Sequence, residues 1–184
     1  FESQNLDVEI NDDFIELKNI LTSKDKDDYA YDFDPAFESY LDKATGFVLY
    51  LRYNDEVVAT YAAKKLSLLN FIEQMKLKYP GNYETIDEFP GQEAYSSCQW
   101  VSKEHRGKKW GRVLDHLKKH ICFDFMKCTT NYAIHKSDLR DYHVNHLAYS
   151  NNKKLAVIPN GDVGGAGEVI DKEYWIAYSS NTEW

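Results

Sequence analysis

The sequence contains little cysteine, proline or methionine: its 184 residues include three Cys, four Pro and two Met. An odd number of cysteines without a C-x-x-C pair predicts free thiols in a reducing compartment rather than a disulfide framework. These cysteines are Cys98, Cys122 and Cys128. No Pro- or Gly-rich linker divides the chain, and its length suffices for a sizeable core. We therefore expect a single domain over residues 1–184.

Long apolar runs are also absent, and no stretch approaches the length that spans a bilayer. The residues after Phe1 lack the charged-then-apolar layout of a secretory signal, so we expect a cytoplasmic protein. Positive charge is in the minority, because 22 Lys and Arg stand against 30 Asp and Glu for a net charge of −8. Such a chain is a poor non-specific ligand for nucleic acid and suits a cationic or amine-bearing partner better.

Hydrophobic periodicity predicts a mixed order of helices and strands. The expected helices cover Leu6–Leu21, Pro35–Thr45, Leu66–Tyr79, Trp110–Phe125 and Asp138–Asn151, the last with Ser137 as its N-cap. The expected strands cover Phe47–Tyr53, Val57–Lys64, Tyr95–Val101, Thr130–His135, Leu155–Ile158 and Tyr174–Ser179, of which the first two form a hairpin. Helical crossovers between strands predict an α/β or α+β sheet domain.

The stretch from Gln99 to Leu114 is the most informative part of the chain. It predicts a strand, a short basic turn that contains Gly107, and a helix that starts near Trp110. Such a turn directs backbone N–H groups and the positive end of a helix at one point, which suits a phosphate group. Neither G-x-x-x-x-G-K-[ST] nor G-x-G-x-x-G occurs, which excludes a P-loop and a Rossmann turn. The helix is expected to turn its charged face to solvent, and that face holds Arg112, Asp115, His116, Lys118 and Lys119.

This stretch resembles the acyl-CoA signature of the GNAT superfamily of N-acyltransferases, which runs roughly V-x-P-E-x-R-G-x-G-x-G-x-x-L. Lys109 stands where the family usually has its middle glycine, and Lys103 stands where it often has proline. The resemblance implies a GNAT-like mixed central sheet flanked by helices, with the helix at Leu66–Tyr79 added between the third and fourth strands. The matching residues are Arg106, Gly107, Gly111 and Leu114.

The resemblance also implies an activity, namely transfer of an acetyl group from acetyl-CoA to a primary amine by direct attack. The acceptor is a small cationic molecule or a peptide or protein amine. The alternatives are a catalytically silent GNAT-fold domain that binds acyl-CoA or a protein partner, and an interaction domain without a coenzyme A site. Coenzyme A is expected to lie with its pantetheine arm along the backbone of Trp100 and Val101. Its pyrophosphate is expected at Arg106, Gly107, Lys108, Lys109, Trp110, Gly111 and Arg112.

By the same resemblance, Tyr149 is the acid that protonates the leaving thiolate, on a helix after the fifth strand. The general base is left open among Glu93, Gln99, Glu104 and His135, of which we name His135 because it ends a strand and could face the cleft. No metal is expected, since the pairs His116/His120 and His143/His146 lack a third ligand. Cys98 is expected to be a buried thiol.

Two further segments are assigned only in outline. Residues 25–34 alternate carboxylates with aromatic rings, which is typical of a solvated acidic loop and would also suit the binding of an ammonium group. The glycine-rich stretch 160–167 is expected to be a mobile tip between the last two strands, near the entry for the acceptor.

Overall fold

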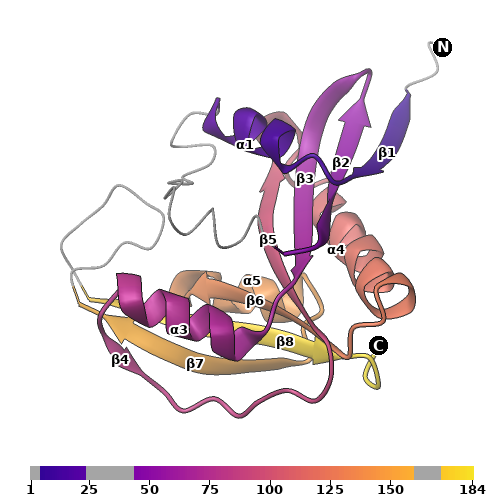
Figure 1. The fold of residues 1–184 in the computed structure, drawn as a ribbon. Helices are drawn as coiled ribbons and strands as arrows, with labels where there is room; N and C mark the ends of the chain where they lie inside the picture. The colour runs from indigo at the N-terminus through magenta and orange to yellow at the C-terminus, as the bar shows by residue number, and fades with distance from the viewer. Residues whose placement is uncertain (1–4, 24–43, 160–170) are drawn as a thin grey trace.

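A mixed sheet is the centre of the fold. The computed structural model describes residues 5–23, 44–159 and 171–184. In this part of the chain the strand order is β1-β2-β3-β5-β6-β8-β7-β4 (Figure 1). The strands are β1 (Leu6–Asn11), β2 (Gly46–Tyr53), β3 (Glu56–Lys65), β4 (Asn82–Tyr83), β5 (Glu93–Val101), β6 (Thr130–Lys136), β7 (Asn151–Ile158) and β8 (Lys172–Ser180). The helices are α1 (Phe14–Thr22), α3 (Leu68–Lys78), α4 (Trp110–His120) and α5 (Arg140–Asn145).

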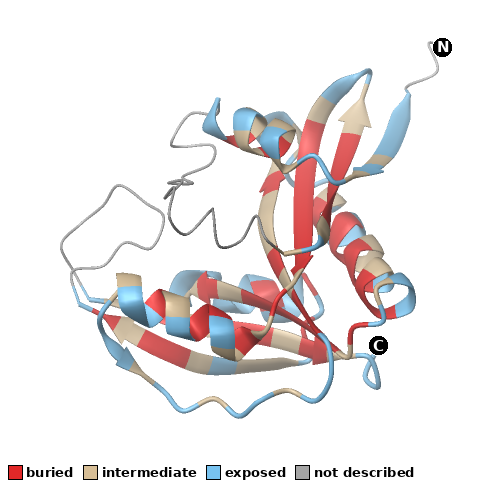
Figure 2. Cartoon of the chain, viewed as in Figure 1, coloured by how far each residue is buried: buried red, intermediate tan, exposed pale blue. Residues whose placement is uncertain are grey.

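The hairpin of β2 and β3 is confirmed, and it forms the rigid centre of the first half of the sheet. Asn54 and Asp55 make its two-residue turn with φ angles of 48° and 67°. Asn and Asp tolerate this left-handed region better than most residues, which explains the sharp reversal. Apolar side chains on both faces of the two strands are buried (Figure 2).

The sheet divides between β5 and β6, which form its one parallel pair among the described strands. Their pairing covers only Glu93–Tyr95 against Thr130–Tyr132. Beyond this point the two halves of the sheet run apart (Figure 1). A bulge follows in β5, since Cys98 has a φ of 56° and the register with β3 shifts there. We call the place where β5 and β6 diverge, beyond Tyr95 and Tyr132, the split.

The helices cover both faces of the sheet. Tyr95 and Tyr132 point to one face, where they pack with α3, and α1 covers the same face of the first half. Ala94 and Asn131 point to the other face, towards α4. Helix α5 lies on that second face, where Leu147 packs in one cluster with strand residues of β6 and β8. Helices α4 and α5 therefore border the split from one side. Within the described residues no helix is both long and apolar enough to cross a membrane.

Two sequence-based helices are wrong in extent. The predicted helix Leu6–Leu21 is a strand, β1, followed by α1, which Asp13 caps by accepting hydrogen bonds from the amides of Ile15 and Glu16. Apolar and polar residues alternate over β1, and its pairing with β2 selects this period over the helical one. The predicted helix Asp138–Asn151 is shortened to α5, which ends at Asn145, and the chain then turns through Ala148, whose φ of 49° no α-helix can contain.

The remaining elements follow the expected positions closely. The added helix is α3, and α4 continues beyond His120 as a π-helical turn over Ile121–Phe125. Most of the predicted helix Pro35–Thr45, the acidic segment 25–34 and the glycine-rich segment 160–167 lie outside the described residues.

Lys109 is the residue before α4 and lies in the left-handed region, with φ 63° and ψ 16°. This conformation costs a non-glycine residue about 1–2 kcal/mol. We therefore expect Lys109→Gly to raise the free energy of unfolding by about 0.5–1 kcal/mol, because the relieved strain exceeds the added entropy of the unfolded chain. Urea denaturation measures the change. Lys109→Ala is the matched control, since it removes the charge and keeps the strain. Equal or lower stability of the glycine variant would contradict this expectation.

Candidate active site

The turn between β5 and α4 presents free backbone donors. A single turn of 3₁₀ helix over Lys103–His105 leads into Gly107, whose φ is 83°. The N–H groups of Gly107, Lys109, Trp110 and Gly111 donate to no described residue. Donors at the start of a helix that no described residue accepts from are of the kind that binds a phosphate group.

Side chains of the turn and of its two flanking elements brace its backbone. The ring of His105 stacks on that of Trp110 at 4.8 Å, and the Ser102 hydroxyl contacts Nδ1 of His105 at 2.8 Å. The Lys108 ammonium lies 5.1 Å from the centre of the Trp110 ring. Arg106 donates from Nε to the carbonyl of Val101 at 3.2 Å. The backbone of the turn is thus held while its basic groups Arg106, Lys108, Lys109 and Arg112 remain exposed.

One edge of β5 faces the split. On the opposite edge Trp100 pairs with Thr60 of β3, whereas on the β6 side no described strand pairs with the stretch from Ser96 to Val101. The Trp100 side chain is buried among core residues on the α1 face. That coenzyme A lies along the backbone of Trp100 and Val101 stays a prediction.

Gln99, Gly111 and Tyr142 meet at the mouth of the split. The amide Nε2 of Gln99 donates to the carbonyl of Gly111 at 3.3 Å. A Cβ at Gly111 would lie 3.0 Å from both the Gln99 amide nitrogen and the Tyr142 hydroxyl oxygen, so a larger residue there would push both groups away from the first turn of α4 by a few tenths of an ångström. Burial raises the pKa of Tyr142, which keeps its hydroxyl protonated at neutral pH. Tyr142 was not among the predicted site residues, because its sequence carries no signal that places it beside α4.

The charged stripe of α4 is buried, which corrects the expectation of a solvent-facing charged surface. Asp115, Lys118 and Lys119 all have no exposed surface. Lys118 donates to Oδ1 of Asp115 at 2.7 Å, and Lys119 lies 3.0 Å from Oδ2. These residues follow Gly111 at helical spacing, so they share the face of α4 that borders the split. Helical spacing alone cannot distinguish such a polar buried stripe from a solvated one.

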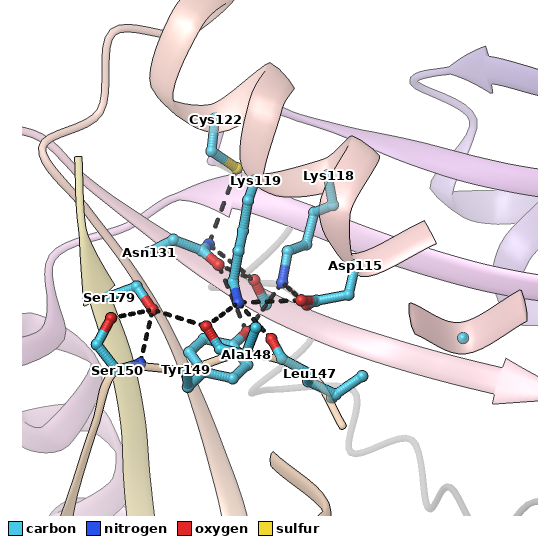
Figure 3. A network of polar contacts seen from close by, with 12 residues as sticks. Asp115, Lys118, Lys119, Cys122, Asn131, Leu147, Ala148, Tyr149, Ser150 and Ser179 are labelled. Carbon is cyan, nitrogen blue, oxygen red and sulfur yellow. Dashed lines mark hydrogen bonds and ion pairs between the residues drawn. The ribbon is translucent and has the colours of Figure 1, made fainter. Parts of the chain in front are cut away.

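Lys119 ties α4 to the turn between α5 and β7. Its ammonium donates to the carbonyl of Ala148 at 3.0 Å and also to that of Leu147 (Figure 3). Burial lowers the pKa of Lys119 to about 8, against the opposing effect of Asp115. For Lys118 the attraction of Asp115 and two hydrogen bonds outweigh burial, and the pKa rises.

Tyr149 lies in this turn rather than on a helix. Its side chain is 2% exposed, and its hydroxyl accepts a hydrogen bond from Lys118 at 2.9 Å. The same hydroxyl donates to Oδ1 of Asn131 at 3.4 Å. Burial raises the pKa of Tyr149, although Lys118 opposes the shift. Tyr149 therefore lies beneath the split, within a network that joins α4 to β6.

The candidate bases are placed apart from one another. Glu93 is buried and accepts a hydrogen bond from the amide of Leu68 at the start of α3, whereas Glu104 is exposed in the turn.

The thiol of Cys98, which was expected to be buried, is half-buried. Among the described residues, no group of three or more His, Cys, Asp or Glu side chains gathers as a metal site would need.

His135 forms a pair with His143 that the sequence analysis did not foresee. The two rings stack at 4.1 Å with planes 12° apart. Each Nδ1 contacts a main-chain carbonyl, that of Lys136 for His135 and that of Leu139 for His143. This leaves Nε2 as the acceptor of each neutral ring, and in His135 it faces the amide of Asn152 at 3.4 Å. In the part of the chain that the structure describes, Nε2 of His143 has no hydrogen-bond partner and can accept one from a ligand.

Acid should weaken the fold through His143. Burial, and the neighbouring His135, lower its pKa to about 4 from 6.5. Between these values the unfolded chain binds a proton that the folded chain does not, so stability is full above pH 6.5 and falls as the pH drops towards 4. We expect a loss on the order of 3 kcal/mol over this window from this group. His143→Asn, which can keep the bond to the Leu139 carbonyl, should show a shallower loss in urea denaturation at each pH.

The same substitution at exposed His146 controls for the change in composition. A wild-type pH dependence in His143→Asn would show that this histidine does not hold the depressed pKa.

No protein-family model matches this chain. No curated protein matches it by sequence either. Solved structures do match in fold. The ribosomal-protein-S18-alanine N-acetyltransferase from Escherichia coli has 10% identity and a TM-score of 0.59, with 96% of this chain and 94% of that one covered. FeeM, an N-acyl amino acid synthase from uncultured soil microbes, has 7% identity and a TM-score of 0.59, with 99% and 94% covered.

A third structure is Naa50 from Arabidopsis thaliana in complex with a bisubstrate analogue that joins coenzyme A to a peptide. It has 15% identity and a TM-score of 0.57, with 93% of this chain and 97% of that one covered. These matches extend over nearly the whole length of each partner. The chain therefore has the fold of the GNAT superfamily of N-acyltransferases.

Proposed function

We propose that this protein is an N-acetyltransferase that moves an acetyl group from acetyl-CoA to a primary amine. The observation that carries the proposal is the turn before α4, where four unpaired N–H groups lie among exposed basic side chains in a chain of net charge −8. Such a local reversal of charge fits the pyrophosphate of a nucleotide cofactor. The pairing of β5 with β6 ends at Tyr95, and we place the pantetheine arm beside the later residues of β5.

Direct attack needs a proton donor for the leaving sulfur, and two tyrosines are candidates. Tyr142 has its hydroxyl at the first turn of α4, and its side chain is 38% exposed, so a ligand in the split can reach it. Tyr149 is enclosed, and its hydroxyl already receives a hydrogen from Lys118. Geometry therefore favours Tyr142 as the acid and gives Tyr149 a supporting position beneath it.

The base that accepts the amine proton is one of the two stacked histidines or a water molecule that they hold. His143 is favoured over His135, since its Nε2 is the acceptor without a protein partner. Its lowered pKa makes it a weak base, which suits transfer through water to solvent better than direct abstraction.

The acceptor is an amine, and its class stays open between small molecules and peptides. The solved neighbours include an N-acetyltransferase named for an alanine of a ribosomal protein. They also include an enzyme in complex with a bisubstrate analogue that contains a peptide. The acidic character of this chain favours a positively charged acceptor.

Binding of acetyl-CoA should stabilise the protein. Ligand at a hundredfold excess over its dissociation constant adds about 2.7 kcal/mol to the unfolding free energy. We expect the melting temperature of the wild type to rise with acetyl-CoA and that of Arg106→Glu to rise much less, because the new carboxylate repels the pyrophosphate. Lys76→Glu is the control, since it makes the same charge change on exposed α3. No rise in the wild type would exclude a coenzyme A site, while a rise without any amine acetylation would favour the catalytically silent alternative.

The variants Tyr142→Phe and Tyr149→Phe test which of the two tyrosines is the general acid. With an amine that an acetylation screen identifies, we expect Tyr142→Phe to lower kcat about a hundredfold, because general acid assistance is lost. Tyr149→Phe should instead lower the unfolding free energy by about 1–3 kcal/mol, since Lys118 loses a buried partner. Steady-state kinetics and urea denaturation of both variants check this. The reverse pattern, with kcat lost only in Tyr149→Phe, would assign the acid to Tyr149.

A further inference from the structure

The buried charges of α4 lie where the sheet divides. The Lys118 ammonium donates to the Tyr149 hydroxyl, which donates to Asn131 of β6. The Asn131 amide in turn contacts the Ser96 hydroxyl of β5 at 2.8 Å. Ser96 directly follows the last paired residue of β5, and Asn131 belongs to the paired segment of β6. The network therefore runs from α4 to the base of the split (Figure 3).

This network holds an excess of positive charge. Asp115 supplies one carboxylate, whereas Lys118 and Lys119 supply two ammonium groups, and all three side chains are fully buried. Lys119 has a pKa of about 8 and so is mostly cationic at neutral pH. The other titratable groups that face the cluster are neutral at pH 7, because burial raises the pKa of each phenol and of the thiol and lowers that of the imidazole. They are Tyr61, Tyr142, Tyr149, Cys122 and His143.

A purely structural role does not account for the second lysine. Asp115 and Lys118 alone would form a neutral buried pair, and a buried charge without its own counter-ion is costly. Lys119 does hold the carbonyls of Leu147 and Ala148, yet an uncharged amide donor could do the same. What the ammonium adds is a field in a region of low dielectric, where charges act over longer distances than in water.

We propose that the excess positive charge of the Asp115–Lys118–Lys119 cluster stabilises the sulfur anion that coenzyme A becomes when its acetyl group leaves. The inference rests on the function proposed above. In that reaction the amine nitrogen forms a bond to the acetyl carbon, and the carbon–sulfur bond breaks with its electron pair on sulfur. The amine proton passes to solvent, the sulfur takes a proton from a tyrosine hydroxyl, and that tyrosine regains its proton from solvent. Lys118 and Lys119 do not contact the sulfur, since both side chains are enclosed, so they are positioning residues. They act through the hydrogen bond from Lys118 to Tyr149 and through the electrostatic field of their two ammonium groups.

The thiol of bound coenzyme A measures this effect without an acceptor amine. Its ionisation can be followed by the ultraviolet absorbance of the thiolate across pH, with the desulfo-coenzyme A complex subtracted to remove tyrosine ionisation. We expect the thiol pKa in the wild-type complex to lie about one unit below that of free coenzyme A, because a cation favours the charged form. In Lys119→Met, coenzyme A should still bind, and its thiol pKa should rise most of the way back to that of free coenzyme A.

Two further variants make the test specific. Lys119→Gln keeps donors for the Leu147 and Ala148 carbonyls without the charge, so it should raise the thiol pKa like Lys119→Met even if the methionine variant folds poorly. Lys76→Met removes an exposed charge from α3 and should leave the thiol pKa as in the wild type.

The outcomes separate this inference from the proposed function. A wild type that does not bind coenzyme A would overturn both. Normal binding with a thiol pKa equal to that of free coenzyme A, or with one that neither Lys119 variant changes, would overturn the electrostatic role alone. If neither variant folds, the wild-type thiol pKa decides: a lowered value supports the inference and an unshifted value rejects it.

Discussion

The parallel pairing of β5 with β6 ends after three residue pairs, and the arrangement of the site depends on that ending. Two strands that separate leave unpaired N–H and C=O groups on their facing edges, and such groups need partners. The bulge at Cys98 adds twist to β5 and turns its later residues relative to the earlier ones. An extended ligand with amide groups can replace the missing strand, since it supplies donors and acceptors along one edge. The sheet is thereby both the scaffold and one wall of the site.

Polar side chains close the base of the split, where an apolar core would otherwise continue. Asn131 bridges to Ser96 and to the Ala94 carbonyl, and so completes the hydrogen bonds that the diverging backbones cannot make. The charged groups behind them carry a desolvation cost, which Asp115 offsets for one lysine more fully than for the other. The two lysines accordingly differ, with the pKa raised at Lys118 and lowered at Lys119. One carboxylate thus faces two ammonium groups within this buried cluster.

The sequence predicts best what local patterns determine. The β2–β3 hairpin and the turn at Gly107 follow from short-range signals, namely alternating apolar residues, turn formers and a basic loop before a periodic helix. The split itself is not readable, because it depends on which strands become neighbours. The buried stripe of α4 is likewise hidden, since Asp115, Lys118 and Lys119 have the spacing of an ordinary solvated face. Tyr149 was placed on a helix because periodicity alone continues α5 past Asn145, whereas the chain leaves the helix there and turns through Ala148.

Lys109 stands where the acyl-CoA signature usually has a glycine, and the turn nevertheless keeps a left-handed conformation there. A glycine reaches the left-handed conformation without cost, whereas lysine holds it here at a cost of about 1–2 kcal/mol. The surrounding contacts supply that energy, since the stack of His105 on Trp110 and the bond from Arg106 to Val101 restrain both ends of the turn. In exchange the site gains an exposed ammonium beside four unpaired backbone donors. A charge-assisted hydrogen bond to a phosphate is about twice as strong as a neutral one, so the substitution can strengthen anion binding even as it weakens the fold.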